Sequence, residues 1–361
     1  MDVAAHQSLC RAVQHNCHVA DARHAGDLPL CTYLLQLREY YRWEQCLPFG
    51  ASLPQAAVGA WIARREALWD ELAQRDFSAL PLGDGTGDVD PFDVDTVNRQ
   101  IQSAGLVYAA GLAGRDQAVF VLAQRHPGAA EAKSTTALPV LMAGREWARG
   151  LLTPPAALDT RNDPPTIVIR RAALARWCWE RFESFSLRPR ADSAFAAVVR
   201  DYGLDTDLEA GLSRCVDEQC EALLLHETGE YQAGRRLGPG WSALRMALPS
   251  RRGELAARAV RDHLADLHIT LPTLLARGRA SALHFWFATY EGWRQQLFPG
   301  LVVAYRRWCD GDNGQALHGA VHAGHAHFMA IALQALDLHA SGQGGAAVQA
   351  LLLSPPSICN S

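Results

Sequence analysis

The sequence contains almost no lysine: Lys133 is the only one among 34 lysine and arginine residues. A lysine that grips phosphate or forms a Schiff base would therefore have to be Lys133. The segment around it, Pro127–Ser134, has Pro127 and Ala132 where a phosphate-binding loop needs glycine. We therefore expect no P-loop nucleotide and no pyridoxal phosphate (PLP) as cofactor.

Paired cysteines are also missing. The sequence has nine cysteines, an odd number, and none of them forms a C-x-x-C pair. This pattern does not support a zinc ribbon or a thioredoxin-like redox centre. We expect reduced cysteines that lie mostly in the core.

Long apolar runs and basic blocks are absent. No run of about 18 uncharged apolar residues occurs, so we expect no membrane span. The formal net charge is −4 and no cluster of positive charge stands out, which argues against nucleic acid as a partner. The first 17 residues contain no continuous apolar segment, so the expected location is cytoplasmic.

What the sequence does contain is enough apolar material for a large core, at 49% hydrophobic residues in 361. Helical periodicity dominates, and short β-like runs occur only in the middle of the chain, where Leu106–Ala110 and Ala118–Leu122 suggest a hairpin. The expected fold is mainly α, a multi-helix bundle-like architecture with a small antiparallel β section. We expect an N-terminal helical region (1–104), a β-containing insert (105–170) and a C-terminal helical region (171–361) packed as one globular unit with the first.

The histidine-rich segment Leu317–Leu336 is the most informative part of the chain. Read as a helix, it places His318, His322 and His325 on one face, in line with the apolar residues Met329, Ala332 and Leu336. Imidazoles on an apolar face need hydrogen bonds, carboxylates or a metal. The stripe therefore predicts a metal site, and satisfied core histidines are the alternative.

A second helix, which opens near Asp205, carries His226 and Glu230 at the end of an apolar stripe. Their i, i+4 spacing allows both to bind one metal ion. The string His226–Glu230 is not a zincin motif, because Glu230 stands where the second histidine would be. A buried hydrogen-bonded His–Glu pair is the alternative interpretation.

Two further helices carry ionisable groups. In Glu254–His268, the carboxylates Asp262 and Asp266 lie away from the apolar face, with His263 as the better inward candidate. Glu254, Arg258 and Asp262 follow one another at i, i+4 spacing, so we expect them to form a ladder of ion pairs on a solvated face. The segment Leu283–Trp293 is apolar on nearly every side and predicts a buried helix. Its His284 and Glu291 lie two turns apart on one polar line and are further candidate metal ligands.

Near the N-terminus, Arg23, Arg38 and Arg42 are candidates for binding an anionic substrate, although intrahelical ion pairs explain the last two equally well. A nucleophilic Cys17 or Cys31 would need a nearby base, which the sequence alone does not reveal.

Several strings resemble those of an uncharacterised bacterial protein family, over most of the chain: Cys17–Arg23, Arg38–Trp43, His226–Glu230 and Arg258–Asp266. No activity is assigned to that family, so the resemblance implies no catalytic residue.

The leading hypothesis is a metal-dependent helical enzyme that uses iron, zinc or manganese, with the reaction and the catalytic residues unidentified. Its partner would be an unknown small molecule or protein. The alternatives are a non-enzymatic helical scaffold or partner-binding protein, whose tryptophan-rich helices serve packing or an interface, and a metal-free enzyme that acts on a small anion.

Overall fold

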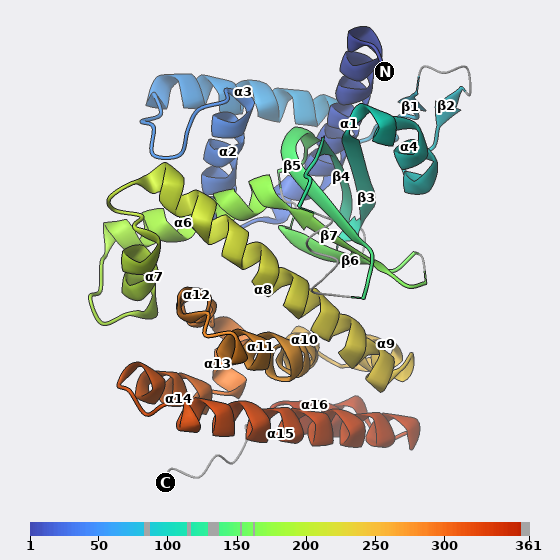
Figure 1. Cartoon of the computed structure of the whole chain (residues 1–361). Coiled ribbons are helices and arrows are strands. Elements are labelled where there is room, and N and C mark those ends of the chain that lie inside the picture. Colours follow the sequence, from blue (N-terminus) through green and yellow to red (C-terminus); the bar gives the residue numbers. More distant parts are fainter. Residues whose placement is uncertain (83–86, 114–116, 129–136, 152–153, 162, 355–361) are drawn as a thin grey trace. The chain divides into compact units, whose positions relative to one another are not determined.

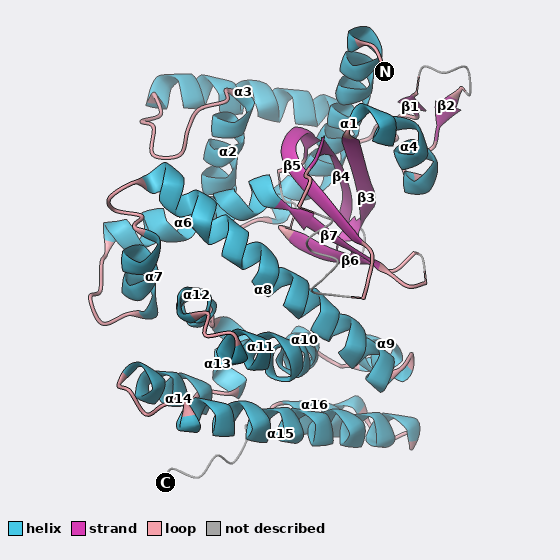
Figure 2. Cartoon of the chain, in the orientation of Figure 1, coloured by secondary structure: helices cyan, strands magenta, loops and turns pink. Residues whose placement is uncertain are grey.

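The computed structural model of the chain describes residues 1–361 except for 83–86, 114–116, 129–136, 152–153, 162 and 355–361. Lys133 and its loop therefore lie outside the described residues. The chain divides into two compact units, Met1–Arg181 and Phe182–Ser361. Every strand in the described part of the chain belongs to the first unit, as the magenta arrows in Figure 2 show.

The first unit combines helices with a sheet (Figure 1). Its helices are α1 (Val3–His24), α2 (Leu30–Glu44), α3 (Gln55–Leu72) and α4 (Val94–Ile101), with the 3-10 turns η1 (Ala25–Asp27) and η2 (Gln102–Ala104). Its strands are β1 (Leu80–Pro81), β2 (Asp88–Val89), β3 (Leu106–Ala113), β4 (Gln117–Arg125), β5 (Val140–Arg149), β6 (Ala156–Asp159) and β7 (Thr166–Arg170). Helix α6 (Arg171–Leu187) begins in this unit.

The sheet is larger than the sequence indicated. It has five strands in the order β3-β4-β5-β7-β6, and β5 and β7 run parallel, so the expected small antiparallel section is corrected to a mixed sheet. The predicted hairpin is confirmed: β3 pairs antiparallel with β4, with Leu106 opposite Gln124. Strand propensity indicated which segments form strands but not which strands pair with each other. β7 enters between β5 and the unpredicted strand β6.

Helix α1 covers one face of this sheet. Its residues Val13 and Cys17 are buried together with Tyr108, Phe120 and Leu122 of strands β3 and β4. The Cys17 thiol donates a hydrogen bond to the carbonyl oxygen of Phe120 at 3.2 Å. Burial raises the pKa of this thiol well above its usual value. Cys17 is therefore a core residue, and no described basic side chain is hydrogen-bonded to its thiol to make it a nucleophile.

The second unit is helical in all its described elements (Figure 1). Its helices are α7 (Ala194–Tyr202), α8 (Leu208–Leu237), α9 (Gly240–Ala247), α10 (Arg251–Ala265), α11 (Leu271–Ala276), α12 (Ala280–Ala288), α13 (Gly292–Leu297), α14 (Gly300–Cys309), α15 (Gln315–Ala340) and α16 (Gly345–Leu352). A π-helical turn, η3 (Asp266–Thr270), joins α10 to α11. None of the described helices in the chain combines the length and the apolar character that crossing a membrane requires.

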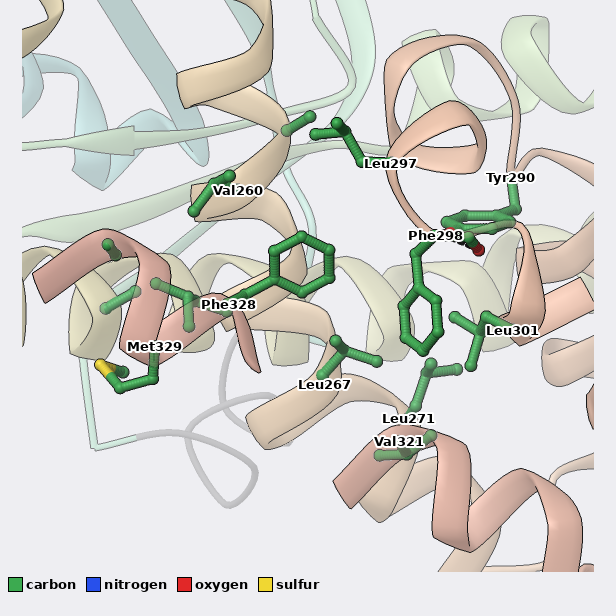
Figure 3. Close-up of a cluster of buried hydrophobic side chains, with 14 of the residues drawn as sticks. Val260, Leu267, Leu271, Tyr290, Leu297, Phe298, Leu301, Val321, Phe328 and Met329 are labelled. Atoms are coloured by element: carbon green, nitrogen blue, oxygen red, sulfur yellow. Dashed lines mark hydrogen bonds between the residues drawn. The ribbon is translucent and has the colours of Figure 1, made fainter. Parts of the chain in front are cut away.

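The core of the second unit forms where α10, η3, α14 and α15 meet. Figure 3 shows Val260, Leu267, Phe298, Val321 and Phe328 turned toward one another, and all of them are buried. The hydroxyl of Tyr290, which lies beside them, donates to the carbonyl oxygen of Phe298 at 3.1 Å. This hydrogen bond fixes the short connection between α13 and α14 and gives the Tyr290 hydroxyl a partner.

The face of α15 that meets this core is not the predicted one. Met329 and Ala332 are buried as expected, but His318 and His322 are exposed. The core-facing line runs instead through Leu317, Ala320, Val321, Gly324, Phe328, Ile331 and Ala335. Gly324 lies so close to the Phe298 ring that a Cβ there would stand 2.3 Å from its Cε1 atom. Glycine and alanine at these positions allow neighbouring parts of the chain to pack closely against α15. A search for large apolar side chains does not detect such a face.

At Gly229 of α8 the backbone lies directly against the backbone of Ala265 in α10. A Cβ on this residue would lie 2.6 Å from the carbonyl oxygen of Ala265, which is backbone and cannot rotate away. The glycine is therefore required for the contact between the two helices, although glycine in a helix interior is otherwise unfavourable.

We expect Gly229→Ala to lower the free energy of unfolding by about 1–3 kcal/mol, because the added methyl group forces the two backbones apart. Gly234→Ala is the matched control on the same helix, since a Cβ there meets nothing within 4 Å. The control should gain up to about 1 kcal/mol from helix propensity. Denaturant unfolding of both variants measures the difference, and an equal gain in both would show that the helices are not in contact at Gly229.

A second expectation concerns the buried Asp21 on α1, whose two carboxylate oxygens lie 2.9 and 3.0 Å from the Leu151 amide that donates to them. Burial raises the pKa of Asp21 to about 7, and the Leu151 hydrogen bond and the charge of Arg149 oppose this only partly. Between about pH 4 and pH 7 the folded chain then holds a proton that the unfolded chain has released. Stability should fall as pH rises through this window, by at most about 1.4 kcal/mol per pH unit.

Asp21→Asn should remove this slope and remain folded, because the amide oxygen can still accept from Leu151. Asp76→Asn, at an exposed position in the same unit, should keep the wild-type slope. Urea unfolding at pH 5, 6 and 7 gives the comparison. Identical slopes in wild type and Asp21→Asn would contradict the raised pKa.

Candidate functional site

A cluster of ionisable groups forms where α8 meets α10 in the second unit. His226 and Glu230 project from consecutive turns of α8, and Asp262 faces them from α10. One potential ligand atom of each residue lies within 4.8 Å of the others. Within the part of the chain that the structure describes, this is the one group of three or more His, Cys, Asp or Glu residues that meets this criterion for a metal site. The predicted pair His226 and Glu230 is thus brought together, and Asp262 joins it.

The imidazole of His226 is oriented by Asp266. Its Nδ1 atom lies 2.8 Å from Oδ1 of Asp266, the first residue of the π-helical turn η3. Asp266 is buried and also accepts a hydrogen bond from Nη1 of Arg294 at 3.1 Å. With Nδ1–H donating to this carboxylate, Nε2 is the ring atom left to bind a ligand. A π-helical turn beside such a group is a frequent feature of functional sites.

Charges of both signs meet in the cluster and shift the pKa values of its groups. Burial lowers the pKa of His226, but the charge and hydrogen bond of Asp266 outweigh this and raise it to about 10. Burial raises the pKa of Asp266, and His226 reverses this and lowers it to about 2. Glu230 is paired with Arg261. Without a bound cation, His226 is therefore protonated at neutral pH, and it stands as a positive charge among acidic groups.

Two further carboxyl groups of the cluster have raised pKa values. Burial raises the pKa of Glu227 to about 7 and that of Asp262 to about 6. Both hold a proton at a higher pH than usual because burial and their acidic neighbours disfavour another negative charge. A positive charge placed near these groups would favour their ionised forms.

The burial of Asp266 corrects the expected solvated face of α10. Asp266 is 1% exposed and Asp262 is half-buried. Only the more N-terminal part of the ladder exists, as an ion pair of 2.9 Å between Glu254 and Arg258. The helical wheel failed because α10 packs against α8 on one side and against α13 and α15 on others. At Asp262 and Asp266 its polar line faces α8, whereas Arg258 remains exposed.

The other predicted pair, His284 and Glu291, does not form a site. Nδ1 of His284 lies 2.6 Å from the Tyr305 hydroxyl, and its Nε2 lies 3.8 Å from Asp201. Helix α12 ends at Ala288, and Gly292 adopts a φ of +64°, so Glu291 stands in the turn before α13 and is exposed. The prediction of one continuous buried helix over 283–293 was wrong.

The three candidate histidines of α15 do not belong to the cluster around His226. His318 and His322 are exposed, and the half-buried His325 stacks on His268 with ring centroids 4.8 Å apart. The structure therefore corrects the inward stripe, and it places none of the three in the group around His226.

The N-terminal arginines separate in the structure. Arg23 donates to the Arg75 carbonyl at 2.5 Å, and Arg38 pairs with Glu39 at 3.0 Å. Arg42 is buried, with its Nε 3.1 Å from Glu39. Of these three candidates, Arg42 alone lines a cavity of about 810 Å³ in the first unit. Its wall is formed by Gln14, Glu39, Arg42, Trp43, Glu44, Cys46, Leu47, Phe49, Arg145, Glu146, Trp147, Arg149, Ala172, Ala175 and Arg176.

Sequence reasoning missed most of this wall. Glu146 and Arg149 belong to strand β5, whose pairing partners the sequence did not reveal. Both are buried. The available signal was the run Arg145–Arg149 directly after an apolar strand: charged residues that continue a central strand must find buried partners.

Comparison with known proteins gives a family and no activity. The N-terminal domain of a family of unknown function, DUF6866, matches residues 8–170, and the C-terminal domain of the same family matches residues 175–354. No curated protein and no solved structure matches the chain. The resemblance to an uncharacterised family is thereby confirmed.

Proposed function

The chain belongs to DUF6866, a family of unknown function, and we propose from the cluster between α8 and α10 that it is a metal-dependent enzyme. His226, Glu230 and Asp262 would hold one divalent cation. The observation that carries this proposal is the convergence of one imidazole nitrogen and two carboxylates within 4.8 Å, with Asp266 behind the imidazole.

The arrangement of His226 supports the proposal most directly. Metal-binding histidines usually donate the second ring N–H to a carboxylate, which fixes the tautomer and makes the ligating nitrogen more basic. Asp266 provides such a carboxylate at 2.8 Å, and Arg294 holds it in place from its other oxygen. Asp266 is thus a positioning residue, and His226 Nε2 is the proposed ligand atom.

The three proposed ligands restrict which metals could bind and what chemistry the metal could perform. One imidazole with two carboxylates suits manganese, iron or zinc. Three protein ligands leave coordination positions for water or substrate, as catalytic sites do and structural zinc sites do not. In such a position the ion can polarise a carbonyl or phosphoryl oxygen, or lower the pKa of a bound water.

Binding would require local rearrangement. Ligand bonds of about 2.0–2.2 Å bring the ligand atoms of one ion to about 3–3.5 Å from each other. The side chains would therefore close by at most about 2 Å, and Glu230 would give up its ion pair with Arg261 to the cation. The proton on His226 would leave at the same time.

A second candidate function rests on that ion pair. Arg261 with Glu230, and His226 with Asp266 and Arg294, form a complete set of ion pairs without any metal. In this interpretation the cluster only fixes α8 against α10, and the chain is a non-enzymatic scaffold or partner-binding protein. The two candidates differ in what the cluster binds and in what removal of His226 does.

Metal titration distinguishes them. The full chain, purified without an affinity tag and freed of metal with a chelator, is titrated calorimetrically with Mn²⁺, with Zn²⁺ and, without oxygen, with Fe²⁺. We expect one ion per chain. His226→Ala and Asp262→Asn should weaken binding at least tenfold because each removes a ligand, and Asp266→Asn should weaken it about 10–100-fold through the lost orientation of His226.

His322→Ala is the matched control, since His322 is an exposed histidine of the same unit. It should bind metal like wild type and unfold at the same temperature. If the chain binds no metal, or if His322→Ala and not His226→Ala abolishes binding, the proposed centre is wrong. In that case a loss of stability in His226→Ala, which leaves Asp266 buried with Arg294 as its remaining ion-pair partner, would favour the scaffold.

A further inference from the structure

The cavity of about 810 Å³ in the first unit contains a cation that its neighbours do not neutralise fully. Glu146 is the nearest acid to Arg149, but it lies 3.9 Å from Arg149 Nε and only 2.6 Å from Arg170. Glu39 is likewise taken by Arg38 and Arg42. Arg149 therefore lies farther from the Glu146 carboxylate than Arg170 does, and Glu146 can neutralise only one of the two arginines fully.

Hydrogen bonding at Arg149 is also incomplete. Its side chain is 2% exposed, yet no described residue accepts a hydrogen bond from its buried Nε–H. Its Nη2 donates only to the Glu39 carbonyl at 3.4 Å. The guanidinium otherwise lies over the rings of Tyr40 and Trp43, with its Cζ 5.0 and 4.9 Å from their centroids. A buried guanidinium in this state is unfavourable unless a further acceptor binds to it.

The rest of the cavity wall is partly charged and partly apolar. Its other arginines are Arg42, Arg145 and Arg176, and its acids are Glu39, Glu44 and Glu146. Trp43, Leu47, Phe49 and Trp147 provide an apolar, largely aromatic surface. The buried Nε1–H of Trp147 likewise has no acceptor among the described residues. The volume is that of pockets that enclose small molecules.

We propose that this cavity binds a small organic oxyanion, a carboxylate or a phosphate ester, whose charged group pairs with Arg149 and whose flat apolar body lies against Trp43 and Phe49. The charged group completes the hydrogen bonds of the guanidinium, and the aromatic wall rejects ligands that carry only the charge. This inference concerns the first unit and does not depend on the metal centre.

Calorimetry on the full chain tests the proposal with benzoate and phenyl phosphate as probes, and with benzyl alcohol and inorganic phosphate as comparisons. Benzoate, phenyl phosphate or both should bind at least tenfold more tightly than benzyl alcohol, which lacks the charge, and than inorganic phosphate, which lacks the ring. A preference between the two probes identifies the charged group. No binding of either probe at about 10 mM would overturn the proposal.

Variants locate the site. Arg149→Met should lower affinity for the preferred probe at least tenfold, whereas Arg125→Met, at an exposed position on the neighbouring strand β4, should not change it. Ala175→Trp fills the cavity from α6 without removing a charge and should also lower affinity at least tenfold. If Arg149→Met does not fold, Ala175→Trp decides, and wild-type affinity in Ala175→Trp would overturn the proposal.

Cysteine alkylation gives an independent readout. Cys46 lines the cavity and is exposed, while Cys31 and Cys309 are exposed outside it. Probe at saturating concentration should slow the alkylation of Cys46 at least threefold and leave the other two unchanged, as measured by mass spectrometry of peptides. Equal rates at Cys46 with and without bound probe would place the probe elsewhere and refute the assignment.

Discussion

The contact between α8 and α10 at Gly229 sets the position of every ionisable group around His226. Gly229 lies between His226 and Glu230 in sequence, and its partner Ala265 lies between Asp262 and Asp266. The two backbones thus touch in the middle of the four residues, because no Cβ stands between them. A larger residue would separate the imidazole from both aspartates, and the cluster would lose its proposed ligand and its positioning residue together.

Asp266 shows how the helix geometry divides the carboxylates into two roles. It is bound on one side by His226 and on the other by Arg294, so its oxygens are already used. Asp262 lies one helical turn earlier and is half-buried, with its charge disfavoured by its neighbours. In the proposed metal centre, Asp266 would orient His226 and Asp262 would bind the cation. This division follows from the i, i+4 spacing at the junction of α10 with the π-helical turn.

Local patterns in the sequence predicted what depends on local geometry. The β3–β4 hairpin and the juxtaposition of His226 with Glu230 follow from spacing within one element, and both are present. The face of α15 was misjudged because Gly324 and its small neighbours make close contacts that hydrophobicity does not reveal. The burial of Asp266 depends on how many helices surround α10, which no single helix encodes. The insertion of β7 beside β5 and the site of Arg149 depend in the same way on long-range pairing.

Each of the two units buries a network of ion pairs, and the two networks differ in how fully their charges are neutralised. Around His226, Asp266 pairs with His226 and Arg294 and Glu230 pairs with Arg261, whereas around Arg149 the carboxylate of Glu146 is shared with Arg170. Burying ion pairs seldom stabilises a fold more than apolar residues of the same volume would. An incompletely neutralised network, such as the one around Arg149, is less favourable still. An anion beside Arg149 would supply the missing charge, whereas the proposed cation beside His226 would have to replace the proton of His226 and the ion pair between Glu230 and Arg261.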